Sequence, residues 1–147
     1  MSYVENNLMK GEEVVHSTKQ HWIIFFWPMV LVVLGVFFVV AGESSDGIRG
    51  FGAILFLVGL VMIIPAIVSY MTNEFAVTNK RVIIKVGLIK RITLEMNLEK
   101  IESIGVDQSI PGRIFNYGTI IVTGTGATKE PFKAIAEPME FRKAVQS

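Results

Sequence analysis

The histidines are the first residues to test for chemistry, since they can bind metals or act as catalytic bases. His16 and His21 are five residues apart, a spacing that does not align two side chains on one helical face. No acidic partner pattern such as H-E-x-x-H accompanies them. The sequence contains no cysteine, which excludes disulfides, thiolate ligands and thiol nucleophiles. We therefore expect no metal site and no cofactor, and interpret both histidines as interfacial polar residues.

The remaining candidates for catalysis also lack partners. The stretch 124–129 (GTGATK) superficially resembles a phosphate-binding loop, but it lacks the Gly-Lys-Ser/Thr ending and lies between two expected strands. A hairpin turn is the better interpretation. Ser103 and Ser109 have no histidine in the C-terminal half to activate them. Three glutamates near lysines are typical of a solvated edge: Glu95, Glu99 and Glu102. The sequence predicts that the protein is not an enzyme.

Basic residues after position 71 are the candidates for binding rather than catalysis. Residues 72–147 hold eleven Lys and Arg against eight Asp and Glu. A basic edge tethered beside an anionic leaflet gains roughly 1 kcal/mol per residue near the surface. These residues could bind a lipid headgroup, orient the domain, or serve only as topology determinants and solubilising turn residues. The candidate headgroup contacts lie in or beside expected turns: Lys80, Arg81, Lys90 and Arg91.

Two apolar runs indicate the class of protein to which these basic residues belong. Residues 22–41 and 50–70 contain no charged side chain and flank a short polar connector, residues 42–49. About twenty residues at roughly 1.5 Å each give a helix about 30 Å long, the thickness of the hydrocarbon core of a bilayer. A hydrophobic content of 51% and a mean hydropathy of +0.51 are too high for an ordinary soluble domain. The pattern predicts a transmembrane helical hairpin.

The first apolar run does not fit a signal peptide, because it is too long and follows a polar segment of 21 residues. Lys10 and Lys19 precede the hairpin, whereas the connector carries Arg49 together with two acidic residues. Four more basic residues follow the second run: Lys80, Arg81, Lys85 and Lys90. This asymmetry places both termini in the cytoplasm and the connector outside.

Glycines of the two runs occur at matching depths, a pattern that favours close packing of two helices in lipid. Pro65 is expected to kink the second helix because it removes a backbone donor. No ionisable residue lies at mid-membrane, which disfavours a channel or transporter. The candidate packing positions are Gly35, Gly42, Gly52 and Gly59.

The C-terminal half alternates between apolar and polar residues, as half-buried strands do. We expect a loop at 109–113 and a helix that starts near Pro138, with Phe141, Ala144 and Val145 on one apolar face. The predicted strands are 74–78, 81–86, 88–98, 101–107, 117–123 and 131–135. The predicted fold class is membrane α+β, a hairpin followed by an antiparallel barrel or split barrel with a C-terminal helix. Residues 2–20 could form either a helix lying on the membrane or a strand added to the barrel.

The order of short motifs resembles the bacterial pleckstrin-homology (PH)-like membrane proteins. The motifs are 75–82 (FAVTNKRV), Gly87, Leu98-x-x-Ile101, Val106-x-Gln108-Ser109, 113–120 (RIFNYGTI) and Ala136-Glu137-Pro138-x-x-Phe141. Residues 8–15 (LMKGEEVV) and His21-Trp22 resemble the lead-in of the same group. One departure is Phe115-Asn116, where a leucine-glycine-like pair is more usual. The resemblance implies a PH-like barrel on the cytoplasmic face and a tendency to self-associate.

Three regions follow from this reasoning: a cytoplasmic segment 1–21, the hairpin 22–70 and a PH-like domain 72–147. We expect a multi-pass protein of the bacterial cytoplasmic (inner) membrane that acts as a homo-oligomeric scaffold. Its alternative role is a sensor of anionic lipid headgroups. Expected partners are membrane lipids and further copies, with another membrane protein left open and nucleic acid excluded. An apolar group that could be core or a protein-binding patch comprises Ile110, Ile114, Phe115 and Tyr117.

Overall fold

The computed structural model describes residues 2–126 and 129–146 and divides into two compact units. The hairpin unit is Trp22–Met71, and the sheet unit combines Met1–His21 with Thr72–Ser147. The N-terminal segment, which the sequence set apart, thus shares a unit with the C-terminal half.

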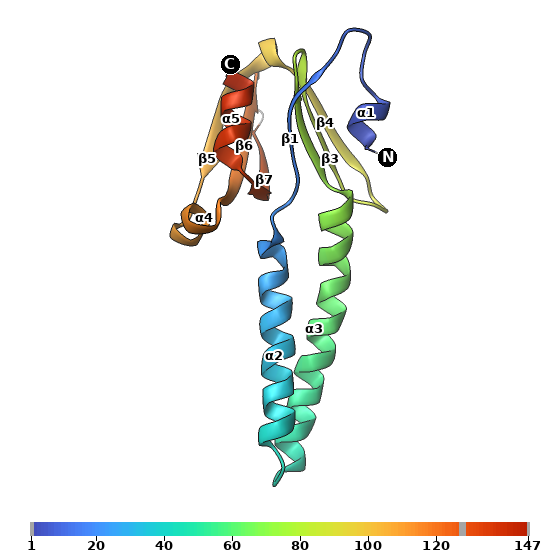
Figure 1. Cartoon of the computed structure of the whole chain (residues 1–147), viewed down its shortest axis with the longest axis vertical. Coiled ribbons are helices and arrows are strands. Elements are labelled where there is room, and N and C mark those ends of the chain that lie inside the picture. Colours follow the sequence, from blue (N-terminus) through green and yellow to red (C-terminus); the bar gives the residue numbers. More distant parts are fainter. Residues whose placement is uncertain (1, 127–128, 147) are drawn as a thin grey trace. The chain divides into compact units, whose positions relative to one another are not determined.

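The hairpin unit holds two long apolar helical segments (Figure 1). A 3-10 turn η1 (Trp22–Phe25) leads into α2 (Phe26–Ala41), and α3 spans Asp46–Thr72. Both segments, Trp22–Ala41 and Asp46–Thr72, are long and apolar enough to cross a membrane. The polar connector is shorter than expected because α3 starts at Asp46, where a carboxylate is favourable at a helix N-terminus. Pro65 lies inside α3 and does not end it; the kink stays a prediction.

The glycines of the hairpin unit lie where the two helix backbones approach each other. A Cβ built on Gly35 would lie 2.5 Å from the backbone nitrogen of Phe56. A Cβ on Gly52 would lie 2.7 Å from the backbone nitrogen of Val39. Gly42 and Gly59 are buried as well, with similarly short distances to backbone atoms. Since no real Cβ tolerates such distances, larger residues at these positions would force the helices apart.

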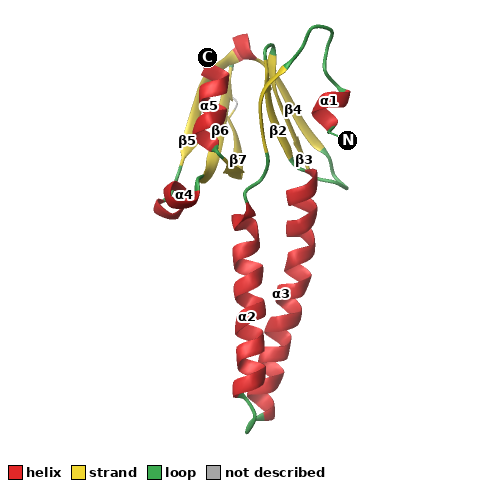
Figure 2. Cartoon of the chain, in the orientation of Figure 1, coloured by secondary structure: helices red, strands yellow, loops and turns green. Residues whose placement is uncertain are grey.

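The described part of the sheet unit holds two antiparallel sheets (Figure 2). The four-stranded sheet has the order β1 (Val14–Thr18), β2 (Glu74–Thr78), β3 (Arg81–Val86) and β4 (Ile92–Asn97). The three-stranded sheet has the order β5 (Ile101–Asp107), β6 (Tyr117–Gly124) and β7 (Lys129–Ala136). A 3-10 turn η2 (Leu98–Lys100) joins β4 to β5. The hairpin is therefore inserted between β1 and β2, which are neighbours in one sheet.

This pairing answers the question that the sequence left open for residues 2–20. Val14 lies opposite Thr78 and Thr18 opposite Phe75, so the segment adds a strand to the sheet. Farther along, the amide of His21 donates to the Ala134 carbonyl at 2.7 Å and the amide of Ala136 donates to the Lys19 carbonyl at 3.0 Å. These hydrogen bonds link the two sheets on one side. Among the described residues, β4 and β5 are not paired with each other, so closure into a barrel is not observed.

The core of the sheet unit is built from both sheets and from the helix α5 (Pro138–Gln146). Along β6 buried and partly exposed residues alternate strictly, as in a strand with one face on the core. Phe141 is fully buried, and Ala144 and Val145 pack against the same core, which confirms the predicted apolar face of α5. The buried apolar residues are Phe75, Val77, Val82, Ile84, Ile104, Ile120, Val122, Ile135 and Phe141.

Two local predictions were wrong. The strand expected at 88–98 starts only at Ile92, because Gly87 adopts a positive φ of 91° and opens a turn. In the loop expected at 109–113, residues 110–113 belong to the short helix α4 (Ile110–Phe115). The Ser109 side chain caps α4 by accepting from the Gly112 amide, and Asn116 ends it in the left-handed region. The turn expected at 124–129 includes residues 127 and 128, which lie outside the described residues.

Candidate functional site

Arg81, a predicted headgroup contact, is buried in β3 and holds the N-terminal segment on the sheet. Its Nε donates to Glu12 Oε1 at 2.9 Å, and Nη2 donates to the Asn7 carbonyl at 2.7 Å. Nη1 pairs with Glu95 on the neighbouring strand β4. All three nitrogens of the guanidinium therefore donate to acceptors within the unit. We therefore interpret Arg81 as a residue that stabilises the fold by joining the N-terminal segment to the sheet.

Glu12 completes this buried ion pair from the other side. Its side chain is fully buried, and it accepts hydrogen bonds from the Thr78 hydroxyl at 2.7 Å and the Met9 amide at 2.6 Å. Burial alone would raise the pKa of Glu12. The hydrogen bonds from Arg81, Met9 and Thr78, with the charge of Arg81, outweigh burial and lower this pKa from 4.5 to about 2. Glu12 therefore stays ionised at neutral pH.

A second carboxylate fixes the start of the chain. Glu74 on β2 accepts from the Ser2 hydroxyl at 2.7 Å and from the amides of Tyr3 and Val4, the first residues of the short helix α1 (Tyr3–Asn6). Burial alone would raise the pKa of Glu74. These hydrogen bonds and the charge of Lys85 outweigh burial, so the pKa of Glu74 is lowered from its ordinary value. Val4 packs with the buried residues Ala76 and Ile83. Glu12 and Glu74 thus fasten both ends of the segment 2–12.

The four predicted headgroup residues do not form one cluster. Lys80 lies in the β2–β3 turn, where its Nζ donates to the Lys10 carbonyl at 2.9 Å. Lys90 and Arg91 lie in the β3–β4 turn at the other end of β3. Arg81 and Val86 are the two ends of β3, five residue steps or about 17 Å apart. The structure therefore brings Lys90 and Arg91 together and leaves Lys80 at the opposite end of the sheet.

The β3–β4 turn exposes large apolar side chains that the sequence interpretation assigned to a strand. Ile89 is 100% exposed, Leu88 52% and Ile92 56%. The turn is held to the rest of the unit because the Gly87 amide donates to Asn73 Oδ1 at 2.9 Å. Its signal in the sequence was Gly87 followed by apolar and basic residues. We name residues 87–92 the docking turn.

Helix α4 presents a second exposed apolar group. Ile110 is 76% exposed, Ile114 71% and Phe115 is exposed too. Tyr117 is only partly exposed, with its ring centroid 5.0 Å from that of His21. Burial lowers the pKa of His21, and a hydrogen bond with the backbone of Phe115 opposes this shift. Three of the four predicted protein contacts are therefore surface residues, and the fourth packs against the histidine.

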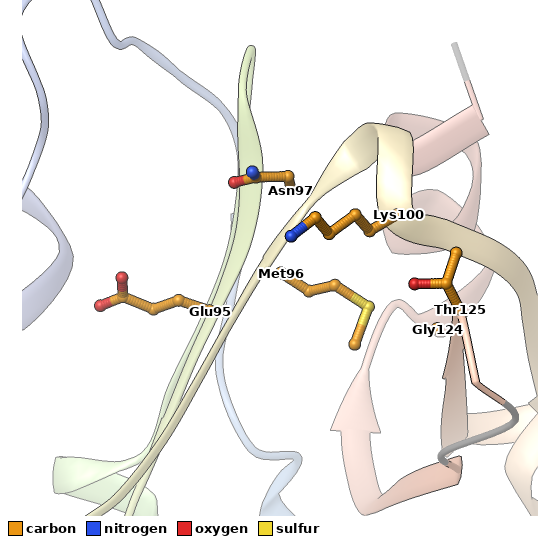
Figure 3. Close-up of a pocket in the computed structure, with 6 residues that line it drawn as sticks. All are labelled: Glu95, Met96, Asn97, Lys100, Gly124 and Thr125. Atoms are coloured by element: carbon orange, nitrogen blue, oxygen red, sulfur yellow. The ribbon is translucent and has the colours of Figure 1, made fainter.

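A pocket of about 310 Å³ lies on the unpaired side between the two sheets (Figure 3). Figure 3 shows the Met96 side chain directed toward Gly124 and Thr125, with Lys100 reaching back toward β4. Glu95 is paired with Arg81 and lies away from these groups. The pocket holds no histidine or serine among its lining residues. Within residues 2–126 and 129–146, His, Asp and Glu side chains do not gather into a group of three that could hold a metal.

Comparison with known proteins identifies a family. A family model described as a bacterial PH domain matches residues 29–147. The match runs from within α2 to the end of the chain and leaves β1 outside it. No curated protein and no solved structure matches the chain.

Proposed function

The chain belongs to the bacterial PH domain family, and from that premise we propose that it is a membrane-anchored, non-catalytic scaffold. In this proposal the hairpin unit crosses the bacterial inner membrane twice. The sheet unit lies on the cytoplasmic side and associates with the sheet units of further copies. PH domains are typically interaction modules rather than catalysts, which supports the non-catalytic part of the proposal.

The helices of the hairpin unit support the anchoring part of this proposal. The two segments hold 20 and 27 residues, which correspond to about 30 and 40 Å of helix. Apolar side chains on both helices are exposed to their surroundings, as expected where lipid replaces water, among them Trp27, Val40, Val61 and Ile64. The excess of Lys and Arg in the two flanks favours the cytoplasmic placement of the sheet unit.

The apolar face of α4 is the observation that carries self-association. Ile110 and Ile114 are four residues apart and share one face of the helix. The helix is held in place, because Ser109 caps it and Gln108 Nε2 donates to the Tyr117 carbonyl at 3.1 Å. A rigid, exposed apolar surface loses little entropy on binding. Confinement to one membrane raises the effective concentration of neighbouring copies further.

The first prediction concerns this face in the full chain. Native mass spectrometry from nanodiscs is expected to give a defined multiple of 16.3 kDa. The double variant Ile110→Gln and Ile114→Gln is expected to weaken association by at least about tenfold, since each side chain loses its apolar burial. Val15→Gln, an exposed apolar position on β1, is the matched control and should keep the assembly.

A wild-type chain that stays at 16.3 kDa at every concentration would contradict the scaffold. A monomer that carries stoichiometric phospholipid would favour the alternative, a sensor of anionic headgroups. An assembly that survives the double variant would show that copies meet through another surface, such as the unpaired edges of β4 and β5.

A further inference from the structure

The docking turn lies at the end of its sheet where the chain enters from α3. Thr72 is the last residue of α3, and Asn73 follows it directly. Asn73 Oδ1 accepts from the Gly87 amide at 2.9 Å, and Asn73 Nδ2 donates to Gln20 Oε1 at 2.7 Å. The same asparagine therefore ties the docking turn to both chain segments that lead to the hairpin unit. If α3 spans the membrane, the docking turn is hydrogen-bonded to the residue that directly follows this helix, and it is therefore held close to the point where the helix leaves the bilayer.

The side chains of the docking turn combine two properties. Leu88, Ile89 and Ile92 are exposed, and Ile89 has no shielding at all. Lys90 and Arg91 stand between them in the sequence and are exposed as well. The Arg91 guanidinium lies 5.9 Å from the centre of the Tyr3 ring, and Lys85 Nζ lies 6.0 Å from the same centre. Segments that bind at the boundary between lipid headgroups and acyl chains typically combine exposed apolar side chains with neighbouring basic residues.

The backbone presents this tip in a defined shape. Gly87 has a φ of 91°, and a Cβ built on it would lie 2.2 Å from the Lys90 carbonyl oxygen. Only glycine fits this tight return of the chain. The next strand resumes at once, with Ile92 opposite Val86. The exposed side chains are thus carried on a short, hydrogen-bonded turn rather than on a long loop.

We propose that the docking turn inserts Leu88, Ile89 and Ile92 into the anionic leaflet from which α3 emerges. Lys90 and Arg91 then lie at the level of the lipid phosphates. This inference rests on the membrane anchoring proposed above, but not on self-association. A lipid surface is favoured over a protein partner because the tether already holds the turn beside the leaflet. The two basic residues complement the negative charge of that leaflet. The sheet unit is then fixed in orientation by its two chain connections and by a third contact, the docking turn.

The test uses the natural absence of cysteine. Ile89→Cys in the full chain carries an environment-sensitive bimane label, in nanodiscs of phosphatidylethanolamine and phosphatidylglycerol. The expected result is a blue-shifted emission that lipids brominated near the headgroup end of the acyl chain quench. Val15→Cys, also exposed and apolar but near the opposite end of the sheet, should keep a water-like, unquenched emission. Adding Lys90→Gln and Arg91→Gln should lower the inserted-to-free ratio on the order of tenfold, and only when phosphatidylglycerol is present.

Two outcomes would overturn the inference. A water-like emission at position 89 would place the docking turn in solvent. A blue shift without quenching by the brominated lipids would mean that protein, not lipid, covers it. Resistance of the chain to alkaline extraction is measured in parallel. A chain released by alkali would overturn the anchoring itself, whereas an anchored chain with a solvent-exposed label would overturn only the docking.

Discussion

Replacing Glu12 by alanine is expected to destabilise the sheet unit by about 3 kcal/mol, because it leaves a buried guanidinium without its main partner. Arg81 keeps the pairing with Glu95, which places the loss at the lower end of the range for broken buried ion pairs. The Met9 amide loses its side-chain acceptor in the same variant, whereas the Thr78 hydroxyl can still donate to the Arg81 carbonyl at 3.0 Å. Hydrogen exchange of β1 and β2 amides in the full chain measures the effect directly.

The matched control is Glu140→Ala on α5. Glu140 accepts from Lys143 at 3.0 Å, but both side chains are more than half exposed. Such a pair contributes about 0.5 kcal/mol or less. Equal effects of the two variants would contradict the role assigned to the Glu12–Arg81 pair.

The same pair sets a dependence on pH. The pKa of Glu12 is about 2 in the folded unit and 4.5 in its ordinary state, so the folded chain binds fewer protons than the unfolded chain. The stabilisation is therefore complete above about pH 4.5 and is lost as the pH falls toward 2. Glu12→Gln should flatten this loss of stability, measured as the hydrogen-exchange protection of the N-terminal segment at each pH. Part of the slope should remain, because the pKa of Glu74 is lowered as well.

Replacing Gly35 by alanine is expected to push α2 and α3 apart. The added Cβ would lie 2.5 Å from the Phe56 nitrogen and 2.8 Å from the Gly52 carbonyl oxygen, and neither backbone atom can move without its helix. Overpacking of this kind costs about 1–3 kcal/mol. Spin labels at the exposed positions Val33 and Val61 should report a longer and broader distance distribution.

Gly50→Ala is the control for this prediction. Gly50 is also helical, but a Cβ built there meets no atom of the described residues within 4 Å. Its distance distribution should match that of the unmodified chain. If Gly35→Ala also left the distribution unchanged, close approach of the helices at Gly35 would be wrong.

Local patterns were sufficient for most elements of the fold. Apolar runs without charge predicted two helices. Alternation and β-branched runs predicted the strands from Glu74 onward, except that the strand expected at 88–98 starts only at Ile92. The resemblance to bacterial PH-like proteins is confirmed by the family match. The membrane crossing and its orientation stay predictions.

The site was harder to predict, because its determinants are distant in sequence. Arg81 follows a turn and looked exposed, yet its partner Glu12 is 69 residues away, beyond the whole hairpin. The residue pairs between β1 and β2 are also far apart in sequence, from 64 residues (Val14 and Thr78) down to 57 residues (Thr18 and Phe75). Pro111-Gly112 suggested a loop, although proline also suits the first turn of a helix such as α4. The docking turn was not predicted from the sequence, because its apolar residues were interpreted as the start of the strand that follows Gly87.

The central claim is that the protein is an anchored scaffold with its sheet unit in the cytoplasm. The most direct test measures which side of the membrane the connector and the sheet unit face. Ser44→Cys in the connector and Ser103→Cys on β5 both replace exposed residues in a chain without other cysteines. A membrane-impermeant maleimide added to intact bacterial cells, with the outer membrane permeabilised, is predicted to label Ser44→Cys. It should label Ser103→Cys only after the inner membrane is opened. Labelling of Ser103→Cys in intact cells, or equal labelling of both positions, would contradict the account.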